Sequence, residues 1–137
     1  MTPYELAKQE VGTKEVPGPQ HNKRILEYHA TTTLKATDDE TSWCSSFVNW
    51  CVTKAGKKGT DSAAARSWLK WGHETKEPKE GDIVVFQRPP SPTSGHVAFF
   101  VKREGDAIYC LGGNQSNQVK VSIYKASDLL SYRRVEE

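Results

Sequence analysis

One stretch decides how this chain folds: residues 43–56, WCSSFVNWCVTKAG. Its apolar side chains recur three and four residues apart, at Cys44, Phe47, Val48, Cys51, Val52 and Ala55. That spacing puts them on one face of an α-helix, and Gly56 is typical of a helix end. Thr41 or Ser42 is expected to cap the helix, and the acidic residues 38–40 suit the positive end of its dipole. The stretch therefore predicts an amphipathic helix with a cysteine in its first turn.

Shorter helices are predicted on both sides of this one. Residues 2–5, Thr-Pro-Tyr-Glu, hold a capping residue, a proline suited to the first helical position and a glutamate placed for a capping box. This helix should run to about Val11 and end at Gly12. Apolar spacing predicts a second helix near residues 22–30 and a further one over residues 62–71.

The second half of the chain has the composition of β-strands. Short runs rich in β-branched residues follow turn signals, and they predict strands at residues 81–86, 96–102, 107–111 and 119–124. Residues 103–106, Arg-Glu-Gly-Asp, are typical of a hairpin turn, whereas the proline-rich residues 88–95 predict a surface loop. Helices followed by antiparallel strands predict an α+β fold, with N-terminal helices packed on a C-terminal antiparallel β-sheet.

Length and composition limit the class of protein. A chain of 137 residues fits a single domain over residues 1–137, with a helical part at about 1–73 and a sheet part at about 80–137. The net charge of +2 is too small to indicate a nucleic-acid partner. The apolar runs are too short for a transmembrane helix, and the first residues resemble no signal peptide. We therefore expect synthesis in the cytoplasm and no membrane insertion.

The three cysteines are an odd number, and no two of them form a Cys-x-x-Cys pair. This pattern disfavours a disulfide framework and a structural zinc site, and we expect neither a metal nor a cofactor. Cys44 is the candidate nucleophile, because a helix N-terminus lowers the pKa of a thiol. Cys51 and Cys110 are interpreted as packing residues. A redox pair of Cys44 and Cys51 is disfavoured, because two helical turns, about 10 Å, separate them.

A nucleophilic thiol needs a base, and His96 is the best placed of the four histidines. It follows Gly95 and opens an apolar strand, so its ring should lie at the end of the sheet, where a scaffold can present a functional group. His21, His29 and His73 are interpreted as surface or packing residues.

Cross-strand pairing indicates a third member of the site. A hairpin turn near Gly105 pairs residues whose numbers sum to about 210, which puts His96 opposite Asn114. Asn114 could then hold the ring nitrogen that does not face the thiol, as in a set of nucleophile, base and orienting residue. The segment Gly112-Gly113-Asn114 is also typical of a strand end, and a register shift of one residue would turn the Asn114 side chain to the other face.

Four segments, in this order, resemble the papain-like peptidoglycan hydrolases, which include the CHAP amidohydrolases/peptidases and the NlpC-type endopeptidases. They are residues 43–50 (WCSSFVNW), 81–86 (GDIVVF), 95–97 (GHV) and 111–115 (LGGNQ). The resemblance covers nearly the whole chain and is greatest to a small CHAP-like subfamily of phage endolysins and secreted bacterial effectors. Many CHAP domains carry a glutamate two residues before the asparagine, whereas this chain has Gly112 there.

The resemblance implies a papain-like fold and a cysteine amidase or endopeptidase that cleaves an amide bond in peptidoglycan stem peptides without a cofactor. In the implied triad, Cys44 attacks the carbonyl, His96 moves the proton and Asn114 orients the ring. Trp43, Trp68 and Trp71 are candidates for substrate binding, although tryptophans at helical spacing are more often core residues.

The resemblance also implies how such an enzyme is used. We expect a monomeric phage endolysin whose partner is peptidoglycan and which reaches the periplasmic face of the wall after release through a membrane lesion. An antibacterial effector of the same chemistry would instead be exported by a delivery system and be paired with an immunity protein. A wall-binding module without turnover is the non-enzymatic alternative, and it predicts unreactive cysteines.

Overall fold

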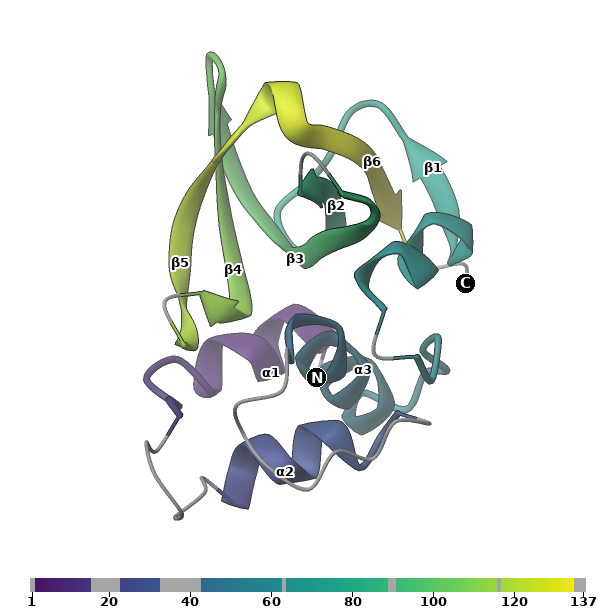
Figure 1. Cartoon of the computed structure of the whole chain (residues 1–137), viewed down its shortest axis with the longest axis vertical. Helices are drawn as coiled ribbons and strands as arrows, with labels where there is room; N and C mark the ends of the chain where they lie inside the picture. Colours follow the sequence, from purple (N-terminus) through teal and green to yellow (C-terminus); the bar gives the residue numbers. More distant parts are fainter. Residues whose placement is uncertain are drawn as a thin grey trace.

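The α-helices gather at one end of the molecule and the strands at the other (Figure 1). The computed structural model describes residues 2–15, 23–32, 43–62, 64–88, 91–115 and 117–134. Within these ranges the α-helices end at Lys54 and the strands begin at His73. This order of elements confirms the predicted α+β fold. None of the helices in these ranges has the length and the apolar character needed to cross a membrane.

The predicted α-helices form as α1 (Pro3–Gln9), α2 (Lys23–His29) and α3 (Cys44–Lys54). The capping box of α1 is confirmed, because the Thr2 hydroxyl accepts from the Glu5 N–H and the Glu5 carboxylate accepts from the Thr2 N–H. The residues predicted to cap α3, 41 and 42, lie outside the described residues. The helix predicted over residues 62–71 is instead a shorter 3₁₀-helix, η1 (Ala65–Lys70). Its hydrogen bonds join residues i and i+3 and wind the backbone more tightly than in an α-helix.

Antiparallel strands form one sheet in the order β1-β6-β2-β3-β4-β5. They are β1 (His73–Thr75), β2 (Ile83–Arg88), β3 (Ser91–Glu104), β4 (Ala107–Gln115), β5 (Gln118–Lys125) and β6 (Leu129–Arg134). A short 3₁₀-helix, η2 (Ala126–Asp128), joins β5 to β6. The predicted hairpin between β3 and β4 is confirmed, and Gly105 in its turn has a φ of 59°, which glycine adopts without strain.

The sheet extends beyond the predicted strands. Strands β1 and β6 were not predicted. β1 has three residues, two of them exposed, and β6 ends in two arginines, so neither gives a regular apolar alternation. The loop predicted at residues 88–95 is wrong in part, because β3 already begins at Ser91. A shift of register between Gln87 and Arg88 lets Arg88 pair with Ser91 and so keeps this segment in the sheet.

The apolar residues of the strands alternate between two cores. Ile83 and Val85 of β2 belong to the core that lies between the sheet and the helices, together with Phe99 of β3. Their neighbours Val84 and Phe86 belong to a second core on the other face of the sheet. Because successive side chains of a strand point to opposite faces, one sheet supports both cores.

Helix α3 lies directly against the sheet, and glycine makes this close packing possible. A Cβ added to Gly113 of β4 would lie 2.7 Å from the Cβ of Phe47 and 2.7 Å from the indole ring of Trp43. Real Cβ atoms do not approach other atoms this closely, so a side chain at this position would push α3 away from β4. The contact brings the first turn of α3 to the end of the sheet.

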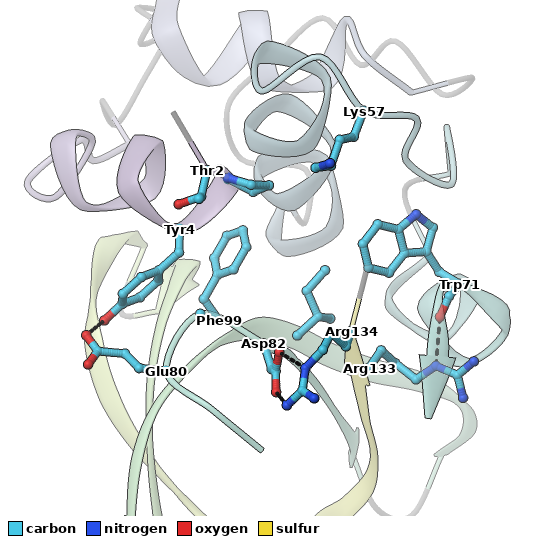
Figure 2. Close-up of a pocket in the computed structure, with 12 residues that line it drawn as sticks. Thr2, Tyr4, Lys57, Trp71, Glu80, Asp82, Phe99, Arg133 and Arg134 are labelled. Carbon is cyan, nitrogen blue, oxygen red and sulfur yellow. Dashed lines mark hydrogen bonds and ion pairs between the residues drawn. The ribbon is translucent and has the colours of Figure 1, made fainter. Parts of the chain in front are cut away.

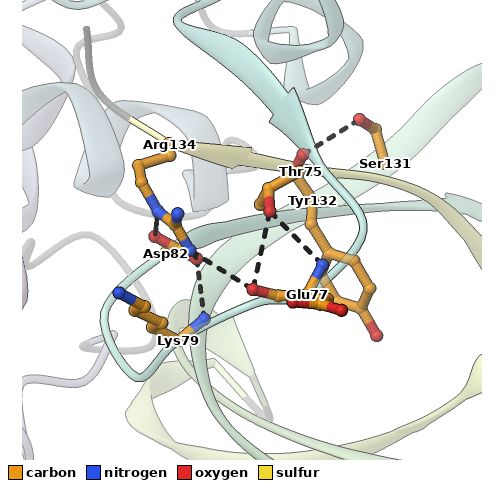
Figure 3. Close-up of polar contacts among 7 residues, drawn as sticks. All are labelled: Thr75, Glu77, Lys79, Asp82, Ser131, Tyr132 and Arg134. Atoms are coloured by element: carbon orange, nitrogen blue, oxygen red, sulfur yellow. Dashed lines mark hydrogen bonds and ion pairs between the residues drawn. The ribbon is translucent and has the colours of Figure 1, made fainter.

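The other end of the sheet is held together by an ion pair (Figure 3). Arg134 of β6 donates to both carboxylate oxygens of Asp82, at 3.0 and 2.7 Å, and the backbone N–H of Lys79 donates to the same carboxylate at 2.7 Å. Asp82 is 8% exposed, so its charge is largely shielded from water and needs these donors. The carboxylate therefore joins β6 to the turn before β2.

Replacing Asp82 by alanine should destabilise the fold. Asp82→Ala removes the acceptor of Arg134 and of the Lys79 N–H, and we expect the free energy of unfolding to fall by about 2 kcal/mol. Urea denaturation followed by tryptophan fluorescence measures this change. The matched control is Glu104→Ala, which breaks the surface salt bridge with Lys102 and should cost less than about 1 kcal/mol. Equal costs for the two variants would contradict this role of Asp82.

Candidate active site

Cys44 is the first residue of α3 and is almost completely buried, with 3% of its surface exposed. Burial raises the pKa of its thiol, but the charge and hydrogen bond of His96, the Val97 N–H and the charge of Arg88 act in the opposite direction. Together they lower the pKa of Cys44 from 9.0 to about 7. The thiol therefore meets the requirement for a nucleophile, because a large share of it is thiolate near neutral pH.

His96 is held from several sides. It lies in β3 opposite Phe86 of β2 and is 1% exposed. Its Nε2 atom lies 2.9 Å from Oε1 of Gln115 and 3.1 Å from the hydroxyl of Tyr124. Its Nδ1 atom lies 3.3 Å from Nη2 of Arg88. Both ring nitrogens thus have polar neighbours, which fixes the plane of the ring.

The amide of Gln115 determines which nitrogen of His96 carries the proton. The Nε2 atom of Gln115 donates to the carbonyl of Cys110 at 3.2 Å and to the carbonyl of Lys120 at 2.6 Å. The amide oxygen is therefore the atom of Gln115 that faces His96. An amide oxygen can only accept a hydrogen bond, so Nε2 of His96 is the donor. In the neutral ring the unprotonated atom is then Nδ1, which accepts from Arg88 and can receive the proton of the Cys44 thiol.

The residue on the His96 ring is Gln115, one position after the predicted Asn114. Between Gly112 and Gln115, β4 contains one more residue than the facing segment of β5, and Asn114 has a φ of 58°. Such a bulge shifts the alternation of side chains by one position. It therefore turns Gln115 to the face of β4 that His96 shares. Asn114 makes interactions of its own, and its catalytic role stays a prediction.

Gly112 gives Gln115 the room it needs. A Cβ added to Gly112 would lie 2.8 Å from Oε1 of Gln115 and 2.8 Å from the Cβ of Ala98. The absence of a side chain at position 112 is thus matched by the presence of the Gln115 side chain in the same space. One feature of the sequence indicates that Gln115 takes the place of Asn114. It is the pair Gly112-Gly113, because glycine inside a strand often marks a bulge.

Tyr124 of β5 is a second residue that sequence reasoning missed. Its ring stacks on the imidazole of His96, with centroids 4.9 Å apart and an angle of 27° between the planes. Phe86 in turn stacks on the Tyr124 ring, with centroids 4.8 Å apart and an angle of 25° between the planes. The stack supports the His96 ring from one face, while Gln115 holds its edge. No motif marks Tyr124, because it lies in an ordinary alternating strand.

The tryptophans proposed for substrate binding lie in different surroundings. Trp43 and Trp68 are fully buried, and their indole N–H groups donate to Glu15 and to Ser45. A fully buried ring cannot contact a wall polymer, so the prediction of substrate binding is wrong for these two residues in this structure. Trp71 is only partly buried; its ring packs against Trp68, and it lines a cavity away from His96.

The remaining cysteines and histidines agree with their interpretation as packing or surface residues. Cys51 and Cys110 are buried, and burial raises the pKa of both thiols. His29 is buried in α2 with its Nδ1 atom 2.9 Å from the Ser46 hydroxyl, and His73 is exposed in β1. His21 lies outside the described residues.

The lowered pKa of Cys44 predicts how the cysteines react with iodoacetamide. Alkylation requires thiolate, so the rate at Cys44 should rise with pH around a midpoint near 7, while Cys51 and Cys110 stay unreactive in the folded protein. Arg88→Gln removes a positive charge that favours the thiolate, so it should move the midpoint upward. Peptide mass spectrometry between about pH 5 and 9 measures these rates. Equal labelling of all three cysteines would contradict the assignment.

Comparison with known proteins places this arrangement in a family. The chain matches the model of the CHAP domain over residues 36–114. A solved structure described as similar to a lipoprotein of the NLP/P60 family, from Staphylococcus aureus, superposes with a TM-score of 0.54 at 16% identity. The alignment covers 99% of this chain and 41% of that one, so the chain spans about two fifths of that protein. The comparison with curated proteins gave no match. Because the family model spans more than half of the chain, the resemblance inferred from the motifs is confirmed, and the chain belongs to the CHAP domain family.

Proposed function

We propose that this protein is a cysteine peptidoglycan hydrolase that cleaves an amide bond in the stem peptides of the wall. CHAP domains are in general cysteine amidohydrolases or peptidases, and the family implies peptidoglycan as the substrate. One observation carries the proposal for this chain. The pKa of Cys44 is lowered to about 7 by a histidine whose far nitrogen is held by Gln115. This is the arrangement that a nucleophilic thiol requires.

The proposed reaction begins with the transfer of the Cys44 proton to Nδ1 of His96. The thiolate sulfur then bonds to the amide carbonyl carbon, and the carbonyl electrons move to oxygen. When the tetrahedral intermediate collapses, the carbon–nitrogen bond breaks and His96 returns the proton to the leaving amine. Water, deprotonated by His96, next hydrolyses the thioester and releases the carboxylate and the free thiol.

The start of α3 supports the charge that develops on the carbonyl oxygen. The first backbone N–H groups of an α-helix have no partner within the helix, and the N–H of Cys44 is one of them. A tetrahedral oxyanion beside the sulfur would accept from this N–H, and the helix dipole favours the negative charge. Nucleophile and oxyanion donor would thus come from the same residue.

Its biological use is proposed on the resemblance of the motifs alone. Their similarity to phage lysins supports an endolysin that reaches the wall from inside the host through a membrane lesion. An exported antibacterial effector has the same chemistry. The bond that is cut, whether muramoyl–L-alanine, an internal stem bond or a cross-bridge, is identified by mass spectrometry of muropeptides after digestion of purified walls.

Removing the thiol should abolish the activity and leave the fold intact. Cys44→Ala is expected to lower the rate of clearing in a turbidity assay on purified walls by at least about 10³-fold, because the covalent intermediate cannot form. Circular dichroism checks that the variant is folded. The matched control is Cys51→Ala, which removes a buried thiol from the same helix and should keep the lytic activity. Undiminished clearing by Cys44→Ala would disprove the mechanism, whereas wall binding without clearing by the unchanged chain would favour the non-enzymatic wall-binding module.

The orienting role of Gln115 is tested against that of Asn114. Gln115→Ala frees the His96 ring, so kcat on a soluble muropeptide should fall by about 10²-fold and KM should change little, because Gln115 contacts the ring and not the substrate. Asn114→Gly deletes the other side chain and suits the positive φ at this position, so its loss of kcat should be clearly smaller. A larger loss with Asn114→Gly than with Gln115→Ala would return the orienting role to Asn114.

A further inference from the structure

A cavity of about 350 Å³ lies among α1, the segment after α3 and the ends of the central strands (Figure 2). Its walls are partly aromatic and aliphatic, and the apolar residues that line it include Tyr4, Trp71, Ile83 and Phe99. In Figure 2 the Lys57 side chain extends over the cavity, with the ring of Phe99 and the indole of Trp71 on either side of it. The size suits a small molecule or the end of a short peptide.

This cavity is separate from the catalytic pair. Neither Cys44, His96 nor Gln115 lines it. In the β2–β3 register, Ile83 pairs with Phe99 at the cavity, whereas Phe86 pairs with His96, three residues or about 10 Å along the strands. On the helical side, Cys44 begins α3 and Lys57 follows its end, so the length of the helix, about 15 Å, lies between them.

The charges around the cavity leave an excess of positive charge. Arg134 is matched by Asp82, and Glu80 accepts a hydrogen bond from the Tyr4 hydroxyl at 2.7 Å. Within the described residues, Arg133 donates to the neutral carbonyls of Trp71 and Gly72 and forms no ion pair with an acid. Lys57 has no ion pair with any residue in the part of the chain that the structure describes. Lys57 and Arg133 therefore line the cavity without an acidic partner among the described residues, against the single carboxylate of Glu80.

We propose that this cavity is a second wall-binding site, which takes the carboxylate end of a short apolar peptide such as a stem ending in D-alanine. The inference rests on the proposed action on peptidoglycan. Lys57 supplies the charge opposite the carboxylate, and the aromatic walls contact the methyl groups beside it. A neutral sugar would use the aromatic walls and leave both cations unmatched, so the charge favours a peptide end over a glycan.

The test uses the full-length Cys44→Ala variant, so that binding is measured without cleavage. ¹⁵N-labelled protein is titrated with N-acetyl-D-alanyl-D-alanine and with the amide of the same dipeptide. We expect saturable shifts of the Trp71 indole N–H and of the Ile83 and Phe99 amides, and binding of the amide at least about tenfold weaker. Lys57→Gln should weaken binding of the acid by a similar factor. The matched control, Lys58→Gln, changes an adjacent exposed lysine that does not line the cavity and should leave binding unchanged.

Three results would overturn the proposal. The first is equal binding of the acid and the amide. The second is the absence of a saturable shift at up to about 10 mM, the range of the weakest specific ligands. The third is larger shifts from a chitin oligosaccharide than from the acid, which would indicate a glycan site. Its failure is distinct from failure of the proposed enzyme, because wall clearing by the unchanged chain is measured separately. Clearing without dipeptide binding removes only the second site, and dipeptide binding without clearing removes only the enzyme.

Discussion

The contact between the first turn of α3 and the ends of β3 and β4 is the constraint on which the rest of the structure depends. Gly113 permits it, because any side chain there would collide with Phe47 and Trp43. At this separation the thiol of Cys44 reaches the His96 ring and the Val97 N–H. Phe47 and Trp43 also belong to the core between the helices and the sheet, together with Phe99 of β3. Packing of the fold and assembly of the candidate site are therefore one requirement.

The three cysteines show how much of the chemistry comes from surroundings. All three are buried, and burial alone raises the pKa of a thiol. Cys51 and Cys110 follow this rule, whereas the pKa of Cys44 falls to about 7 because His96, Arg88 and a backbone donor act against it. The position at the start of α3 matters as well, since Cys51 lies two turns further along the same helix and neither His96 nor Arg88 acts on its thiol.

The parts of the fold that follow from local patterns could be predicted from the sequence, and the parts that follow from long-range pairing could not. Helix α3 and the β3–β4 hairpin carry strong periodicity or turn signals, and both were predicted. Strand β6 has no such pattern, because its arginines are accommodated by carbonyls and a carboxylate contributed by distant segments. Short β1 exists only through its pairing with β6.

The same division holds within the candidate site. The start of a helix and the start of a strand are visible in the sequence, and they identified Cys44 and His96. The orienting residue depends on strand register, where a shift of one position exchanges Asn114 for Gln115. Counting residues across the hairpin assumes a regular ladder, and the bulge at Asn114 breaks that assumption. Tyr124 is brought to the ring by the β4–β5 pairing, which no local motif encodes.

Arg88 has two opposite effects on the catalytic pair. Its positive charge favours the Cys44 thiolate, and its guanidinium donates to Nδ1 of His96 while that nitrogen is unprotonated. Once Nδ1 takes the proton of the thiol, it can no longer accept, and two positive groups face each other across 3.3 Å. Arg88 is exposed, so its side chain can turn away into water at little cost. The neutral form of the pair is thus stabilised by a donor that must leave Nδ1 as the proton arrives, whereas the ionic form is favoured by the charge of the same residue.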